Sequence, residues 1–324
     1  ALQQRIPDDI LWIADEPGYR AAPATQDGIT RFRDHWDTAW EDDGHGAKAE
    51  GFPLADGYHL LDSYSFPNPH KPGIFDTADA KLADRGDRYV LANVWFSLFE
   101  RLWMLRGFEN MLIDPFVDPD GFTKLRDAIV DYNLAMIDQW LARGVNGIFF
   151  SDDWGSQRGL LIDPDAWRTY YKPAYQTMYS RIREAGAHVW MHLCGDITAI
   201  LPDLIEVGVN VLNPVQPQAM DVHRLAIVVF RLYVVVIGVE QRGPVGRGAD
   251  DVAGDFGGCV QHAPAALGCV GAGPRRVAEV RLPCRVIRVQ PGESAARWRG
   301  SPPMVVGDVL PHRAQAGMHH QPRA

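Results

Sequence analysis

A histidine and a cysteine two residues apart form the sharpest candidate for a reactive site. His192 and Cys194 come at the end of the apolar run 188–192, which predicts a buried strand. Side chains two apart in a strand point to one face, so an imidazole and a thiolate could reach one cation. Nitrogen and sulfur ligands favour zinc, with a third ligand from elsewhere and an open position for a thiol or water. The alternative is a buried cysteine beside a hydrogen-bonded histidine.

Two adjacent acids form a second candidate. Asp152 and Asp153 follow the predicted strand 146–151 and precede Trp154, Gln157 and Arg158. Such a loop suits a ligand, with one aspartate and Arg158 in catalytic roles and Trp154 and Gln157 against the substrate. The other aspartate could pair with Arg158 or cap the following segment. The alternative is a solvated turn.

A third candidate is the run Asn213-Pro-Val-Gln-Pro217. Its two prolines fix a rigid turn after a predicted strand, so Asn213 and Gln216 could hydrogen-bond a substrate. The alternative is a purely structural turn. The run 34–36 and His45 are weaker candidates, and we expect Glu100 and Arg101 to be solvated.

Strands and helices alternate along residues 89–213. Apolar runs predict strands, and three- to four-residue periodicity predicts helices. The expected strands are 89–96, 146–151, 188–192 and 209–213, and the expected helices are 121–143, 163–186 and 197–207. This order predicts an α/β fold, either a doubly wound parallel sheet or a (β/α)8 barrel, with the candidate residues at the carboxyl ends of strands. Residues 1–88 lack periodicity and are expected to form an irregular N-terminal segment packed on the strand–helix units of 89–224.

Composition narrows the class of protein. The chain has 324 residues, of which 46% are hydrophobic and 23% charged, as in a globular protein. A net charge of −9 argues against binding to nucleic acid. Four cysteines are too few for a disulfide scaffold, and neither a signal peptide nor a long apolar run is evident. We therefore expect a cytoplasmic protein that does not bind membranes.

The last 100 residues differ from the rest. Residues 225–324 contain 12 arginines but no lysine, threonine or asparagine. Such a step in composition usually marks a boundary, a tail or a linker. A GC-rich gene read out of frame would give the same bias. This segment is therefore predicted to be an atypical tail, with a frame-shifted or unrelated sequence as one explanation.

Several of these motifs together resemble a known family. The runs are Phe150-Ser-Asp-Asp-Trp-Gly-Ser-Gln-Arg-Gly159, Trp190-Met-His-Leu-Cys-Gly195, Ile200-Leu-Pro-Asp-Leu-Ile205 and Leu212-Asn-Pro-Val-Gln-Pro217. They are similar to the uroporphyrinogen decarboxylase superfamily, which includes the cobamide-dependent methyltransferases. The resemblance is clear from about Tyr89 to Met220 and is lost after about Arg224. It implies a (β/α)8 barrel, incomplete or irregular in its C-terminal third.

The resemblance also separates two chemistries. True decarboxylases carry an N-terminal arginine-rich motif and an Asp-containing loop, neither of which is found before Tyr89, and their late Gly-His-Gly loop is also absent. His192 and Cys194 instead match the first two zinc ligands of the methyltransferase branch, whose third ligand is a later cysteine. This implies zinc-assisted methyl transfer between a small molecule and a corrinoid carried by a partner protein, in a chain that could form a homodimer. The alternatives are a metal-free decarboxylase or lyase using Asp152 or Asp153, and an inactive barrel that binds a partner.

Overall fold

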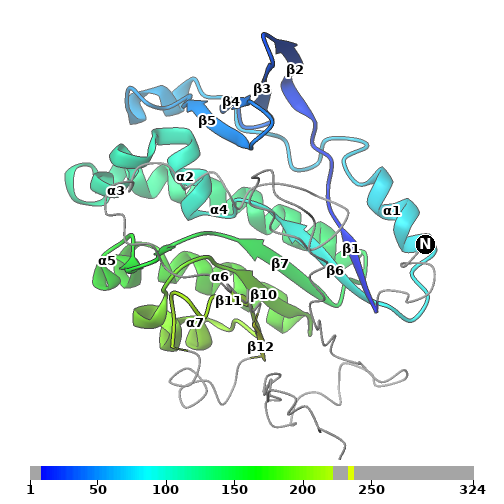
Figure 1. The fold of residues 1–324 in the computed structure, drawn as a ribbon. Helices are drawn as coiled ribbons and strands as arrows, with labels where there is room; N and C mark the ends of the chain where they lie inside the picture. Colours follow the sequence, from blue (N-terminus) through cyan, green and yellow to red (C-terminus); the bar gives the residue numbers. More distant parts are fainter. Residues whose placement is uncertain (1–8, 222–232, 237–324) are drawn as a thin grey trace, which may run out of the picture.

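A parallel sheet forms the centre of the molecule. The computed structural model describes residues 9–221 and 233–236. Six strands lie in the order β1-β6-β7-β10-β11-β12, and every neighbouring pair is parallel (Figure 1). Their bounds are β1 Ile10–Ile13, β6 Tyr89–Val94, β7 Gly147–Ser151, β10 His188–His192, β11 Val211–Val215 and β12 Tyr233–Val236. Since all six are parallel, their carboxyl ends meet at one edge of the sheet.

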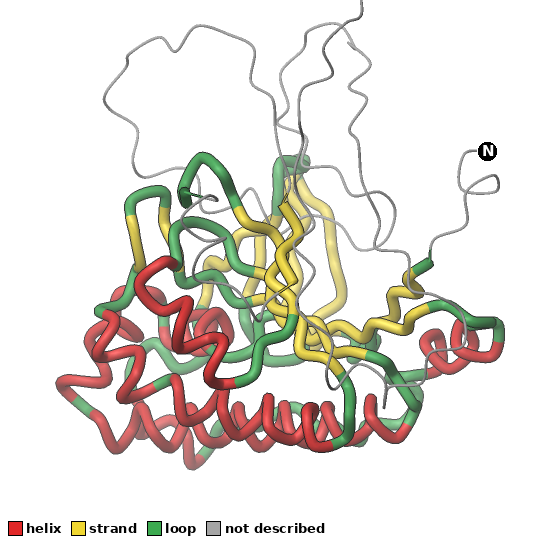
Figure 2. The backbone as a smooth tube through the Cα atoms, turned by 90° about the horizontal axis from the view of Figure 1, so that it is seen from below, coloured by secondary structure: helices red, strands yellow, loops and turns green. Residues whose placement is uncertain are grey.

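Helices cover one face of this sheet. Figure 2 shows the helices gathered on one side of the strands. They are α1 Asp76–Ala83, α2 Phe99–Arg106, α3 Phe108–Val117, α4 Pro119–Ala142, α5 Pro164–Tyr170, α6 Lys172–Glu184 and α7 Leu201–Val207, with the short 3₁₀ turns η1 Tyr58–Asp62 and η2 Thr198–Ile200. The main hydrophobic core lies between the helices and the sheet face that carries Val90, Ala92 and Ile148. A smaller cluster of Leu91, Phe149, Trp190 and Val211 covers the opposite face.

A second, antiparallel sheet precedes the helices. Its strands follow the order β2-β3-β4-β5, namely Tyr19–Gln26, Ile29–Asp34, Ala39–Asp42 and Ala47–Gly51. A two-stranded hairpin, β8 (Gly155–Ser156) and β9 (Gly159–Leu160), follows β7. Residues 9–88 therefore contain more regular structure than expected. Strand β1 also pairs with β6, so the parallel sheet begins within the segment that we expected to be irregular.

The expected helix 163–186 is two helices. Asp163 caps α5 by accepting hydrogen bonds from the backbone N–H groups of Asp165 and Ala166. Helix α5 then ends at Tyr170, and α6 starts at Lys172. Pro173 explains the break, because it lacks a backbone N–H and disfavours helical backbone in the preceding residue. The continuous apolar periodicity across 163–186 concealed this interruption.

The strands that the structure describes form an open sheet. Its edge strands are β1 and β12, and no closed barrel is present in the described ranges. The prediction of a parallel α/β fold is therefore confirmed, whereas closure into a (β/α)8 barrel is not observed. Nearly all of the tail 225–324 lies outside the described residues. Within the described ranges, no helix is both long and apolar enough to cross a bilayer.

Candidate metal centre

The sheet aligns three polar side chains at its carboxyl edge. Ser151 is the register partner of His192, and His192 is the register partner of Asn213. Register partners in neighbouring strands point to the same face. Strands β7, β10 and β11 therefore place a hydroxyl, an imidazole and an amide side by side on the face opposite the helices. The pairing of β10 with β11 brings His192 and Asn213 together, which the prediction of the separate strands did not specify.

Asp153, His192 and Cys194 converge just beyond this layer. One oxygen, nitrogen or sulfur atom of each lies within 4.8 Å of the others, and all three side chains are half-buried. Cys194 Sγ lies 3.6 Å from His192 Nε2, and the Cys194 backbone N–H donates to Asp153 Oδ1 at 2.7 Å. Burial lowers the pKa of His192, opposed by the charge of Asp153. A neutral imidazole keeps the lone pair that binds a metal.

Two loops cross closely to hold this arrangement. A Cβ atom on Gly155 would lie 2.4 Å from the carbonyl oxygen of Cys194, and one on Gly195 would lie 2.4 Å from the carbonyl carbon of Gly155. Such distances exclude larger residues at both positions without movement of the backbone. The Asp196 N–H donates to Ser156 O at 2.8 Å across the same crossing. The two glycines thus allow the Asp153 loop to reach Cys194.

Gln216, which directly follows β11, holds the loop that contains Cys194. Its Oε1 accepts the Gly195 backbone N–H at 2.9 Å and lies 3.3 Å from Gln157 Nε2. The preceding Asn213–Pro214 peptide bond is cis. Gln157 and Arg158 are exposed at the tip of the β8–β9 hairpin, and the Arg158 side chain has no ion pair within the described ranges. The expected pairing of Arg158 with one of the two aspartates is therefore not seen.

Asp152 is a helix cap, which corrects its expected role as an acid or base. The side chain is fully buried. Its Oδ2 accepts from Ser97 Oγ and from the backbone N–H groups of Leu98 and Phe99, each at 2.9 Å, and from the Tyr175 hydroxyl. Its Oδ1 accepts the Glu100 N–H at 2.6 Å. Burial raises its pKa to about 6 although these bonds favour the charged form. The carboxylate is thus occupied by the first turn of α2.

Trp154 also has a different placement from the one expected. It is fully buried, its Nε1 donates to the Tyr175 hydroxyl at 3.2 Å, and its ring meets Trp167 edge-on at a centroid distance of 5.3 Å. Trp154 therefore packs between the sheet and helices α5 and α6. This position favours a core role over contact with a substrate.

Sequence reasoning missed Glu100. We expected Glu100 and Arg101 to be solvated, but both are buried. Ser151 Oγ lies 3.1 Å from Glu100 Oε2. Burial raises the pKa of Glu100 well above its usual range, and the charges of Asp153 and Asp152 raise it further. Helical spacing could not reveal this, because almost every side chain of α2 is buried.

The weaker candidates from residues 34–45 lie elsewhere. Arg101 donates to Asp34 Oδ2 at 2.9 Å, and this pair is buried beneath Trp36. His45 is exposed. His35 lines a separate pocket. None of the three belongs to the metal-ligand group. Cys259, Cys269 and Cys284, where the family would seek a third ligand, lie outside the described residues.

One comparison, with a model of a known family, agrees with the motifs. The sequence model of the uroporphyrinogen decarboxylase (URO-D) family matches residues 93–237, which extends beyond the limit near Arg224 that the motifs indicated. No curated protein matches the chain. A solved methyltransferase from Methanosarcina mazei aligns with a TM-score of 0.48 and 15% identity, covering 58% of this chain. The alignment spans 55% of that protein, so this chain matches about half of its length.

Proposed function

Since the model of the uroporphyrinogen decarboxylase family matches residues 93–237, we propose that the chain is an enzyme of the methyltransferase type within that family. It would bind one zinc ion and transfer a methyl group between a small molecule and a corrinoid on a partner protein. The observation that carries this proposal is the convergence of Asp153, His192 and Cys194.

The donor set fits zinc. One carboxylate, one imidazole and one thiolate are all zinc ligands, and three protein ligands are the usual number at a catalytic site with an open position. Asp153 takes the place that the family resemblance gave to a later cysteine. Zinc held by these residues would lower the pKa of a bound thiol and keep it as the thiolate that accepts the methyl group.

Other residues of the chain would position the reactants. Asn213 lies beside His192 in register, so its amide can hydrogen-bond a substrate at the open side of the centre. Gln216 fixes the Cys194–Gly195 backbone and thus the direction of the thiolate. Burial and the charges of Asp153 and Asp152 raise the pKa of Glu100, whose Oε2 lies 3.1 Å from Ser151 Oγ, so this carboxyl group can orient the Ser151 hydroxyl beside His192.

The metal-free decarboxylase is the weaker alternative. It needs Asp152 or Asp153 as acid or base, but Asp152 is fully engaged by the first turn of α2. Asp153 already accepts the Cys194 N–H and lies among metal-binding atoms. Turnover of a porphyrinogen by metal-free protein would nevertheless favour the decarboxylase.

Cobalt(II) binding tests the proposed metal centre. The full chain should take up about one Co²⁺ with a thiolate-to-metal charge-transfer band, because Cys194 is a ligand. Cys194→Ser should abolish the band, and His192→Ala should weaken binding at least tenfold. The matched control is His45→Ala, at an exposed histidine outside the metal-ligand group. Equal binding by the Cys194→Ser and control proteins would refute the assignment.

Methyl transfer is tested separately. Methylcobalamin and 2-mercaptoethanol serve as simple donor and acceptor. We expect zinc-loaded protein to accelerate the loss of methylcobalamin absorbance, and Cys194→Ser to remove the acceleration. Stoichiometric zinc without any acceleration would contradict methyl transfer but leave the metal site intact. A well-folded protein that binds no metal would favour the other alternative, an inactive protein of this fold that binds a partner.

A further inference from the structure

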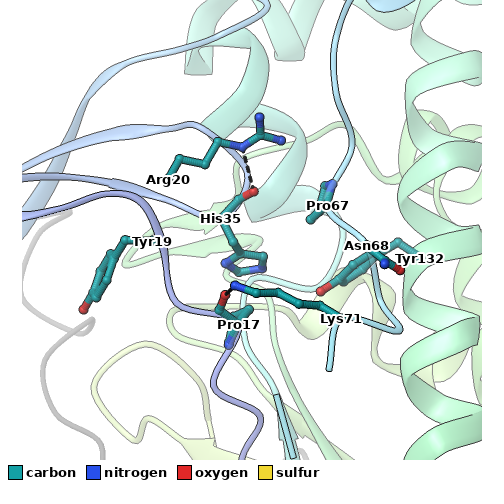
Figure 3. Close-up of a pocket in the computed structure, with 8 residues that line it drawn as sticks. All are labelled: Pro17, Tyr19, Arg20, His35, Pro67, Asn68, Lys71 and Tyr132. Atoms are coloured by element: carbon teal, nitrogen blue, oxygen red, sulfur yellow. Dashed lines mark hydrogen bonds between the residues drawn. The ribbon is translucent and has the colours of Figure 1, made fainter. Parts of the chain in front are cut away.

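A pocket beside the edge strand β1 combines cationic and neutral hydrogen-bond donors. It opens to solvent, has a volume of about 120 Å³, and is lined by Pro17, Tyr19, Arg20, His35, Pro67, Asn68, Lys71 and Tyr132 (Figure 3). Pro17 follows β1, whereas His192 ends β10. Strands β6 and β7 lie between them, which separates the strand ends by about 14 Å across the sheet. The pocket is therefore distinct from the proposed metal centre.

The lining has two positive charges and no carboxylate. Arg20 is anchored through Nε, which donates to the His35 carbonyl at 3.1 Å, and through Nη2, which donates to Ser65 O. Its Nη1 has no hydrogen-bond partner within the described ranges. Lys71 Nζ uses one hydrogen bond, to Pro17 O at 2.8 Å. Both cations are thus held by backbone carbonyls and retain N–H groups for a ligand.

Neutral groups complete the donor set. Figure 3 shows the His35 ring between Arg20 and Lys71. Burial lowers the pKa of His35 to about 3, with the Arg101 charge acting in the same direction, so the ring is neutral and offers one N–H. Burial raises the pKa of Tyr132, which keeps its hydroxyl as a donor. Neither ring nitrogen of His35 has a hydrogen-bond partner among the described residues.

The nearby acids do not neutralise the two cations. Asp34 is paired with Arg101 at 2.9 Å. Burial raises the pKa of Asp15, the acid that acts on Tyr132, to about 6. Glu16 accepts from Thr77 Oγ1 at 3.0 Å. None of these acids is part of the lining, and neither Arg20 nor Lys71 forms an ion pair with them within the described ranges.

We propose that this pocket binds a small oxyanion, either a carboxylate or a phosphate group. Arg20 and Lys71 supply the charge, His35 and Tyr132 supply neutral donors, and the rings of Pro17 and Pro67 form an apolar wall. Guanidinium and ammonium groups bind both kinds of oxyanion. The site is independent of the metal centre, so it stands or falls without the proposed methyl transfer.

Calorimetric titration of the full chain with inorganic phosphate and with acetate tests this site. We expect saturable binding of at least one of them with one site per chain, at an ionic strength held constant with sodium chloride. Lys71→Gln should weaken binding about tenfold, because a charge-assisted hydrogen bond becomes a neutral one. The amide can still donate to Pro17 O, so the fold should be preserved. Lys48→Gln, at an exposed position outside the lining, is the matched control.

The outcomes are distinct. Binding that falls in Lys71→Gln and not in Lys48→Gln supports the pocket, and preference for phosphate or acetate identifies the oxyanion. Absence of saturable binding for both anions overturns the proposal, as does binding that Lys71→Gln leaves unchanged. Cys194→Ser should not alter anion affinity, so loss of the metal centre and failure of this site cannot be confused.

Discussion

Replacing each of the two adjacent aspartates by asparagine should affect a different property, namely fold stability at Asp152 and metal affinity at Asp153. The substitutions Asp152→Asn and Asp153→Asn make the same chemical change at neighbouring positions. Asp152 is fully buried and accepts five hydrogen bonds from Ser97, Leu98, Phe99, Glu100 and Tyr175. Asp153 is half-buried and accepts one bond, from Cys194 N. We expect Asp152→Asn to impair folding and Asp153→Asn to impair metal binding.

The magnitude follows from the hydrogen bonds. The amide NH₂ of Asp152→Asn cannot accept, so its best orientation faces the single donor, Glu100 N, and loses that bond. One lost bond to a charged acceptor costs about 1.5–3 kcal/mol, and the unpaired buried N–H adds about 1 kcal/mol. Release of a desolvated charge offsets about 1 kcal/mol at pH 7. The net loss is about 1.5–3 kcal/mol, or a fall in Tm of about 3–12 °C for a domain of this size.

Asp153→Asn should leave stability nearly unchanged. Its amide oxygen can still accept the Cys194 N–H, so the cost should stay below about 1 kcal/mol. Loss of a charged ligand should weaken zinc binding at least tenfold. Thermal unfolding in the presence of a chelator measures stability, and competition with a chromophoric chelator measures zinc affinity. Wild-type stability in Asp152→Asn, or wild-type zinc affinity in Asp153→Asn, would refute this division of roles.

Three further predictions concern the site and the buried ion pair beside helix α2. Burial raises the pKa of Glu100 in the folded state, so folding favours the protonated carboxyl group. The stability that depends on this proton is present below the unfolded-state pKa and is lost as pH rises. Glu100→Gln should therefore raise Tm relative to wild type more at pH 8 than at pH 5, and an equal change at both pH values would contradict the raised pKa. Arg101→Ala should lower the free energy of unfolding by about 3–5 kcal/mol, because it leaves Asp34 unpaired in a largely buried site. The control Arg181→Ala, at an exposed pair, should lower it by less than about 1 kcal/mol. Chemical denaturation measures both values, and similar losses would argue against a stabilising role of the Arg101–Asp34 pair. Gly155→Ala should weaken zinc binding about tenfold or more by displacing the Cys194 loop, and unchanged affinity would show that the crossing tolerates a Cβ.

Much of the fold could be predicted from the sequence because its strands are short, buried and bounded by glycines. The periodicity that predicted 121–143 matches α4, and the apolar runs match β6, β7, β10 and β11. The break at Tyr171 was signalled only by Pro173, within an otherwise continuous apolar pattern. Strand β1 escaped prediction because four residues are too short to show a period.

The site was predictable only in part. His192 and Cys194 come together through local spacing, which sequence reveals directly. The convergence of Asp153 on them depends on the crossing of Gly155 and Gly195, which is a tertiary contact. Glu100 is buried by packing of α2 against the strand end, which no local pattern in the sequence specifies.

The contrast between Asp152 and Asp153 also has a simple origin in the backbone. Consecutive side chains in extended chain point to opposite sides, so two adjacent acids after a strand cannot both face the same site. One turns toward the helix side and meets the N-terminus of α2, and the other turns toward β10 and meets Cys194. A single peptide unit therefore joins the residue that holds the N-terminus of α2 to the residue that contacts Cys194. A shift of α2 should therefore move Asp153 relative to Cys194, so we expect the Asp152 cap to help position the proposed metal centre as well as to stabilise the fold.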